Sequence, residues 1–346
     1  MNGILTAFWS IIIFSMVIFI HELGHFLAAK RFGVKVHEFA IGMGPALFKK
    51  QKGETLYSIR AIPMGGYCKM EGEDEASEED GSFSRKKPYQ RFIILFAGAF
   101  MNMALGFLIV VLSTSIYQTT IATRYVDSLV PGLGAEQVGV LSGDKILKID
   151  DVSVYTPLDF DMEINKKQNV ELTVSRSGER LTLTVPIMEH EGRRLIGFSR
   201  KTETKNIFNV IKYSYFESFS IVKMTYKGLF GLFNGETSID DMSGPLAIMG
   251  TIGEAAKKGL YYVLFIAMLL SLNLGVMNLL PFPALDGGRI MFVLFEMITK
   301  KKPKPEIEGY IHLCGFVILI GLMLYVTKND IMRSEFMRSI INYFSN

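Results

Sequence analysis

The sequence predicts a polytopic α-helical membrane protein of about four spanning helices, with an aqueous β-rich domain inserted between the second and third spans. Four apolar stretches could cross a bilayer. Of the 346 residues, 49% are hydrophobic and 21% are charged. This composition is too apolar for an ordinary soluble enzyme and too charged for a chain that lies wholly in lipid.

The four apolar stretches run roughly over 4–29, 92–117, 260–280 and 311–326. The third continues, after a break, to about residue 298. A span takes about 20 apolar residues, so the last stretch, with about 16, is marginal. We do not expect the first to be a cleaved signal peptide, because no Lys or Arg precedes Lys30 and no small-residue cleavage site follows.

Basic residues indicate the orientation of the spans, because they are enriched in short cytosolic loops. They gather after the first span, before the second, and between the third and fourth. These residues are Lys30, Arg31, Lys35, Lys49, Lys50, Arg85, Lys86, Lys87, Arg91, Lys300, Lys301, Lys302 and Lys304. The N-terminus and the inserted domain are therefore expected to be extracytoplasmic.

The inserted domain carries a clear β-hairpin pattern. In VELTVSRSGERLTLTV, residues 170–185, apolar and polar residues alternate on both sides of Ser177-Gly178. A further strand is predicted at 146–149 and a short helix near 158–166. We therefore expect a small β-rich domain over 118–190.

The aromatic-rich stretch 206–233 contains Lys212, Glu217, Lys223 and Lys227, and we expect a helix lying on the outer membrane surface. A fifth span is the alternative. The expected division is a first membrane half over 1–117, the inserted domain over 118–190, an interfacial helix and connector over 191–250, and a second membrane half over 251–346. The lipid bilayer is an expected partner. A net charge of only +3 does not indicate a nucleic-acid partner.

The first span contains the segment HELGH, residues 21–25. On a helix His21 and His25 project from one face, about 40° apart, with Glu22 nearby. This spacing is typical of two zinc ligands and a general base. The motif also arises by chance in soluble helices, but ionisable groups inside a span are rare without a function. His21 lies about 26 Å along the helix from Ile4, which predicts a Zn²⁺ site in the cytosolic third of the bilayer.

A third ligand is expected, because catalytic zinc usually has three protein ligands. Asp286 is the stronger candidate, in the broken segment MNLLPFPALDGGRIM, residues 277–291; His312 is the rival. Asp286 could instead cap the following helix. Asp286 can meet His21 only if the chain crosses the membrane an even number of times between 117 and 260. This condition favours the surface helix over a fifth span.

HELGH and NLLPFPALDGGRI together resemble the site-2 protease family of intramembrane zinc metalloproteases, in its bacterial regulator-of-sigma-E-protease branch. Three other segments are similar to it. AIGMGPALF resembles its membrane-dipping loop, IRAIPMGGYCKM its membrane-associated edge hairpin, and VPGLGAEQVGVLSGDKILKIDD its external PDZ domain. The resemblance implies a PDZ-like α/β domain in the inserted region and a place in the bacterial cell membrane.

The resemblance implies that His21, His25 and Asp286 bind zinc, that Glu22 is the catalytic base, and that Asn278 binds the substrate backbone. A helix-packing amide is the alternative for Asn278. Two departures from the family pattern are visible. Ala99 stands where proline is common in the second span, and the turn of the PDZ-like domain reads Gly-Leu-Gly-Ala.

The expected function is that of an intramembrane zinc metalloprotease. It would cleave transmembrane segments of single-span proteins, such as anti-sigma factors or signal-peptide remnants, after a first cut by another protease. The segment 59–70 could receive the unwound substrate by strand addition. Two alternatives are a catalytically silent PDZ scaffold and a metal transporter. Retention of Glu22 disfavours the first, and the lack of repeated halves disfavours the second.

Overall fold

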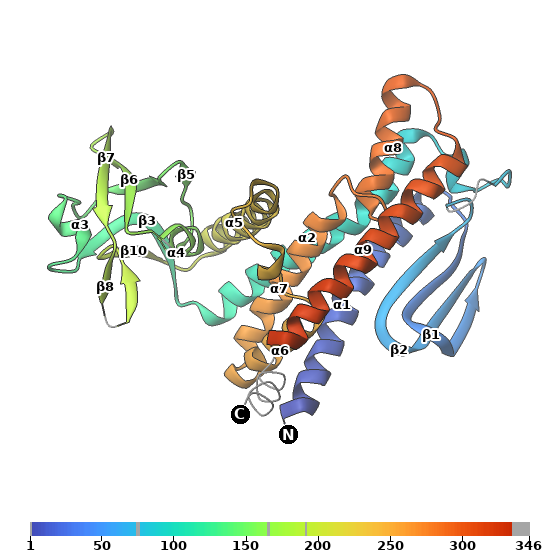
Figure 1. The fold of residues 1–346 in the computed structure, drawn as a ribbon, viewed down its shortest axis with the longest axis horizontal. Helices are drawn as coiled ribbons and strands as arrows, with labels where there is room; N and C mark the ends of the chain where they lie inside the picture. Colours follow the sequence, from blue (N-terminus) through green and yellow to red (C-terminus); the bar gives the residue numbers. More distant parts are fainter. Residues whose placement is uncertain (1, 74–76, 165–166, 191, 334–346) are drawn as a thin grey trace. The chain divides into compact units, whose positions relative to one another are not determined.

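The computed structural model describes residues 2–73, 77–164, 167–190 and 192–333 (Figure 1). Its chain divides into two compact units. Unit 1 comprises Met1–Ile109 and Thr225–Asn346, and unit 2 comprises Val110–Met224. The second unit is therefore an insertion into the first, as the sequence predicts.

Unit 1 is built mainly from helices. Four helices of the described chain are long and apolar enough to cross a membrane: Gly3–Arg31, Pro88–Tyr117, Leu260–Asn278 and Glu306–Arg333. They belong to α1 (Asn2–Arg31), α2 (Pro88–Tyr117), α7 (Leu260–Asn278) and α9 (Pro305–Arg333). The four predicted spans are confirmed as helices. The last is much longer than predicted, because the helix continues past its apolar centre into charged residues at both ends.

Four shorter helical segments also belong to unit 1. They are α6 (Pro245–Lys258), α8 (Asp286–Thr299) and the 3₁₀ turns η1 (Phe83–Arg85) and η2 (Ile239–Asp241). The sequence did not predict α6, which packs against α1, α7 and α9. Glycines bring the long helices close together. A Cβ on Gly24 of α1 would lie 2.3 Å from the Ala97 carbonyl of α2, and one on Gly106 of α2 would meet Leu272 of α7.

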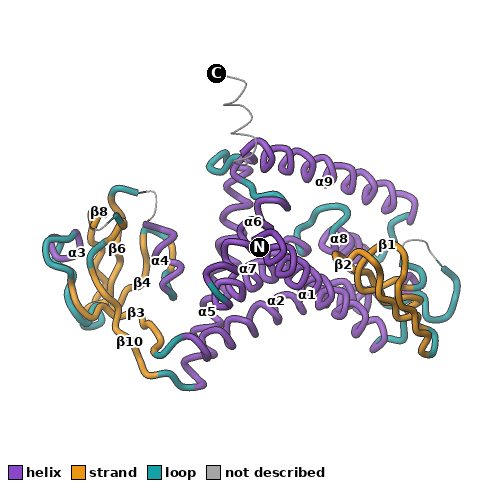
Figure 2. The backbone as a smooth tube through the Cα atoms, turned by 90° about the horizontal axis from the view of Figure 1, so that it is seen from below, coloured by secondary structure: helices purple, strands orange, loops and turns teal. Residues whose placement is uncertain are grey.

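The strands β1 (Val36–Lys52) and β2 (Thr55–Met70) form a separate sheet that curls beside α1 (Figures 1 and 2). Residues 38–41 have register partners on two sides, in 56–59 and in 66–69. The segment 66–70 has partners on one side only in the described sheet, so it forms an edge. The segment 40–48, which resembles a membrane-dipping loop, is part of β1. Its side chains Met43, Leu47 and Phe48 are exposed.

Unit 2 contains a six-stranded sheet with the strand order β10-β3-β4-β6-β7, and β5 pairs with β4. Its elements are β3 (Thr120–Leu129), α3 (Gly134–Gln137), β4 (Lys145–Ile149), β5 (Val152–Ser153), α4 (Pro157–Ile164), β6 (Asn169–Arg176), β7 (Glu179–Pro186) and β10 (Phe198–Thr204). The short strands β8 (Met188–His190) and β9 (Arg193–Leu195) pair with each other. Ile146, Leu172 and Val174 lie in the core of this unit.

The predicted hairpin is confirmed as β6 and β7, and the turn residues Ser177 and Gly178 have φ values of 51° and 91°. Positive φ at both positions is what a tight two-residue hairpin turn requires. The strand at 146–149 and the helix near 158–164 are also confirmed; residues 165 and 166 of that prediction lie outside the described residues.

The predicted end of the inserted domain at residue 190 is wrong. Strand β10 returns to the sheet and pairs with β3, with Thr204 opposite Thr120. Most side chains of β10 are exposed, so its sequence lacks the alternation that marks a half-buried strand. The helix α5 (Ile207–Asn234) then follows. It is confirmed as a helix, and it is not among the described helices that are apolar enough to span a membrane.

Candidate active site

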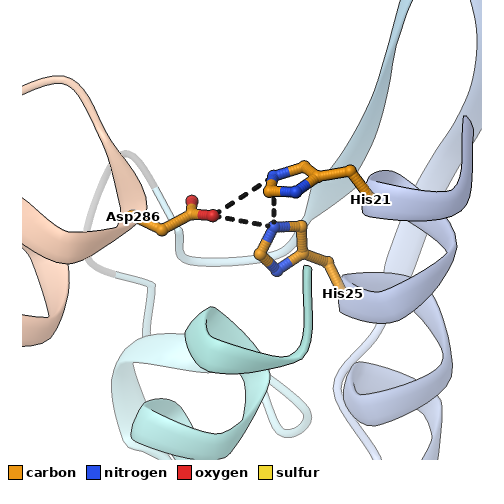
Figure 3. A group of neighbouring side chains, drawn as sticks. All are labelled: His21, His25 and Asp286. Atoms are coloured by element: carbon orange, nitrogen blue, oxygen red, sulfur yellow. Dashed lines mark hydrogen bonds and ion pairs between the residues drawn. The ribbon is translucent and has the colours of Figure 1, made fainter. Parts of the chain in front are cut away.

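Three polar side chains from distant parts of unit 1 meet at one point (Figure 3). His21 and His25 come from α1, and Asp286 is the first residue of α8. The Asp286 Oδ2 atom lies 3.2 Å from Nε2 of His21 and 3.3 Å from Nε2 of His25. The two Nε2 atoms are 3.1 Å apart. The structure therefore brings together the three residues that the sequence analysis proposed as zinc ligands.

The distances fit a metal ion. Ligand atoms at about 2.0–2.2 Å from a tetrahedral zinc would lie roughly 3.3–3.5 Å from one another. The observed separations of 3.1, 3.2 and 3.3 Å are close to this. The Oδ2 atom of Asp286 is also buried and has no hydrogen-bond partner. A carboxylate oxygen in this position gains the partner that burial requires when it binds a cation.

The hydrogen bond at the far side of the His25 ring sets its tautomer. Nδ1 of His25 donates to the carbonyl oxygen of Ile94 on α2, at 2.8 Å. A neutral ring with its proton on Nδ1 presents the lone pair of Nε2 toward Asp286, which is the form that binds a metal.

Asn102 of α2 plays the corresponding part for His21. Its side-chain amide lies 3.4 Å from Nδ1 of His21, and its Oδ1 atom is buried without a partner. Rotation of the amide by 180° about its Cβ–Cγ bond exchanges the positions of its oxygen and nitrogen. The reversed amide accepts from Nδ1–H of His21 and gives Oδ1 its partner. In that arrangement Nε2 of His21 is also free to bind a metal.

Gly98 makes room for both imidazole rings. A Cβ atom on Gly98 would lie 2.3 Å from Nε2 of His25 and 2.8 Å from Cε1 of His21. Only a residue without a side chain allows α2 to approach the two rings this closely. No motif in the sequence identified Gly98 or gave a role to Asn102. The segment AGAFMN shows three small residues before the asparagine, which is the one signal of a close helix contact.

A sharp chain reversal between α7 and α8 brings Asp286 to the histidines. Ala284 has a φ of 76°. The backbone at Gly287 and Gly288 packs against the preceding turn, so added Cβ atoms would lie only 2.1 Å and 2.4 Å from its carbonyl oxygens. The backbone N–H of Ala284 donates to Nδ1 of His312 at 2.9 Å. His312 thus stabilises the turn and does not belong to the ligand group. The helix-cap alternative for Asp286 is not favoured, because its carboxylate faces the two imidazoles.

Glu22 lies beside the edge segment of β2, since a Cβ on Gly66 would be 3.6 Å from Cγ of Glu22. Asn278, the last residue of α7, places its side-chain amide 3.4 Å from the His21 ring. Both residues therefore lie next to the histidines, where the sequence analysis expected a general base and a substrate-binding amide.

The comparisons with known proteins agree with this geometry. The model of peptidase family M50 matches residues 9–322. The chain belongs to peptidase family M50. It is 41% identical over 331 residues to CPE1693 of Clostridium perfringens, which carries the provisional name of a zinc metalloprotease, and the match covers 94% of this chain and 98% of that protein.

Two further relatives carry the name zinc metalloprotease RasP. The protein from Shouchella clausii is 31% identical over 410 residues, covering 93% of this chain and 98% of the relative. The protein from Geobacillus kaustophilus is 28% identical over 408 residues, covering 93% and 97%. The chain is therefore a zinc metalloprotease of the site-2 protease family, as its motifs predicted, and a membrane protein with four candidate spans.

Proposed function

We propose that this zinc metalloprotease works inside the membrane and cleaves transmembrane segments of single-span proteins in regulated intramembrane proteolysis. Anti-sigma factors and signal-peptide remnants, already cut once by another protease, are the substrate class. The proposed topology places the N-terminus and the PDZ-like inserted unit outside a bacterial cell membrane. The site then lies in the cytosolic third of the bilayer.

The observation that carries the proposal is the position of the ligand group on the helices. His21 and His25 lie within α1, which is long and apolar enough to span a membrane. Asp286 follows closely on α7, which meets the same criteria. A soluble protease has no need to place its metal ligands within such helices, and buried ionisable groups there are costly unless they are paired or bind a metal.

His21, His25 and Asp286 hold the zinc in this proposal. Bound there, zinc supplies Lewis acidity and favours deprotonation of water near neutral pH. Glu22 takes a proton from the attacking water and returns it to the nitrogen of the leaving amine.

The substrate has to unwind before it can react, because each carbonyl of a helix is occupied by a hydrogen bond. The edge segment 66–70 lies beside Glu22 and has unpaired backbone groups on one side in the described sheet. It can accept an extended peptide as an added strand. The Asn278 amide can then hold a substrate carbonyl near the histidines. Substrates with helix-breaking residues in the span should therefore be cleaved faster.

The test is the substitution Glu22→Gln in the full chain, assayed on a single-span model substrate with a Gly-Pro pair in its span. Removing the base should lower cleavage by about 10²–10⁴-fold. The zinc content should stay at the wild-type value, because Glu22 is not one of the three ligands. Glu54→Gln is the matched control, since Glu54 is exposed in the turn between β1 and β2.

Wild-type cleavage by the Glu22→Gln protein, with zinc retained, would reject Glu22 as the base. No cleavage of any single-span substrate by a zinc-loaded wild-type protein would favour a silent scaffold instead.

A further inference from the structure

A cavity of about 350 Å³ opens within unit 2, between the sheet and the first half of α5. Residues 121–125 of β3 form one wall, and Tyr213 and Phe216 of α5 form the other, with Tyr155 beside them. Its volume lies in the range of roughly 300–1,000 Å³ that is usual for small-molecule sites. None of the residues proposed for catalysis belongs to this cavity.

The lining is positively charged. Arg124, Lys145 and Lys212 line the cavity, and Glu203 is the one carboxylate in its described lining. The guanidinium of Arg124 lies 5.0 Å from the Tyr155 ring, and Nζ of Lys145 lies 5.6 Å from the Tyr125 ring. None of the three cations forms an ion pair within the described chain. Three cations against one carboxylate favour an anionic ligand.

Hydrogen bonds connect the start of α5 to the end of α2, which is a candidate span. Nζ of Lys205 donates to the carbonyl oxygens of Ser115, at 2.5 Å, and Gln118, at 3.1 Å. These carbonyls lie at the C-terminal end of α2, and α5 begins just after Lys205. The helical wall of the cavity therefore starts at the level where α2 would leave the membrane.

The first half of α5 also exposes one continuous apolar face. Phe208, Ile211, Tyr215 and Phe219 are 81%, 46%, 58% and 46% exposed. At 100° per residue these four side chains fall within about 80° of helix surface. Lys212 lies at the border between this face and the face that lines the cavity. This is the arrangement of a helix that lies in the membrane interface, with cationic side chains at the level of the headgroups.

We propose that the cavity binds the phosphate headgroup of an anionic phospholipid, with its acyl chains along the exposed apolar face of α5. Arg124, Lys145 and Lys212 hold the phosphate oxygens, and the tyrosine hydroxyls hold the headgroup. The proposal rests on the surface position of α5 that belongs to the proposed topology, but not on the peptidase activity.

The test measures lipid binding to the full chain in nonionic detergent by native mass spectrometry. The three probes are dihexanoyl phosphatidylglycerol, dihexanoyl phosphatidylcholine and inorganic phosphate. We expect phosphatidylglycerol to bind at least about tenfold more tightly than either other probe. The double substitution Arg124→Gln with Lys212→Gln should remove most of this preference.

Lys148→Gln is the matched control. Lys148 lies on β4 like Lys145, is exposed and does not line the cavity, so its removal should leave binding unchanged. Equal zinc content and equal cleavage in all variants would show that the variants fold. A negative result for lipid binding would then leave the peptidase proposal intact. Equal binding of phosphatidylglycerol to the wild type and the double variant would overturn the proposal. Inorganic phosphate binding as tightly as phosphatidylglycerol would also overturn it, in favour of a free-anion site.

Discussion

Two buried aspartates, one in each unit, lie in opposite electrostatic surroundings. In unit 2, Asp144 accepts two hydrogen bonds from Arg176, at 2.8 and 2.7 Å, and one from the backbone of Leu141. In unit 1, Asp286 faces two imidazole nitrogens, and its Oδ2 atom has no hydrogen-bond partner. The first carboxylate is completely neutralised by the protein and is structural. The second carboxylate needs a bound cation to give its Oδ2 atom a partner. Burial alone therefore does not distinguish a functional carboxylate from a structural one.

The largest expected effect comes from adding a methyl group at Gly98, beside the rings of His21 and His25. Gly98→Ala would place a carbon atom 2.3 Å from Nε2 of His25. The rings must move, and displacements near 1 Å typically cost about 100-fold in rate. We expect cleavage to fall by at least this factor, together with the zinc content. Gly321→Ala on α9 is the control, since a Cβ there meets nothing within 4 Å. Wild-type activity in Gly98→Ala would contradict the geometry of the site.

A smaller effect is expected from the residue that supports His21. Asn102→Ala removes the acceptor for Nδ1–H and should weaken zinc affinity by about 10–100-fold. Asn102→Asp keeps an acceptor and should retain most of the affinity. Competition with a chelator of known zinc affinity measures both. Equal affinities in the Ala and Asp variants would mean that Asn102 does not orient the ring.

The smallest effect on cleavage is expected at the neutralised aspartate, whose substitution changes the stability of unit 2 rather than the metal site. Burial opposes ionisation of Asp144, but its hydrogen bonds with Arg176 and Leu141 outweigh it and lower its pKa. A lowered pKa contributes stability that is present above about pH 4 and is lost as pH falls through the folded-state value. Asp144→Asn should destabilise unit 2 by about 2–3 kcal/mol at pH 7. This is less than the roughly 3–5 kcal/mol typical of breaking a fully buried ion pair, because Arg176 is partly exposed to solvent.

Hydrogen exchange of β4 and β6 in the full chain measures this difference at each pH. The gap between wild type and Asp144→Asn should be constant down to about pH 5 and should shrink below pH 4. Asp127→Asn, at an exposed position on β3, is the control. A gap that widens toward low pH would have the wrong sign for a lowered pKa.

Features with a local period were predictable from the sequence, and features that depend on close tertiary approach were not. The alternation around Ser177-Gly178 predicted the β6–β7 hairpin, and the four-residue spacing of His21 and His25 placed both rings on one face. Asp286 could be predicted because a charged residue in a broken apolar segment needs a partner. The return of β10 to β3 and the space at Gly98 depend on segments far away in the chain, so no local pattern predicted them.

Zinc content per chain tests the central claim most directly, since it needs no knowledge of the substrate. The measurement compares purified wild type, Asp286→Ala and His312→Ala. The structure predicts about one zinc in the wild type and in His312→Ala, because His312 bonds to the Ala284 backbone. It predicts a large loss in Asp286→Ala. Full zinc content in Asp286→Ala, with zinc lost in His312→Ala, would contradict the assignment of the third ligand.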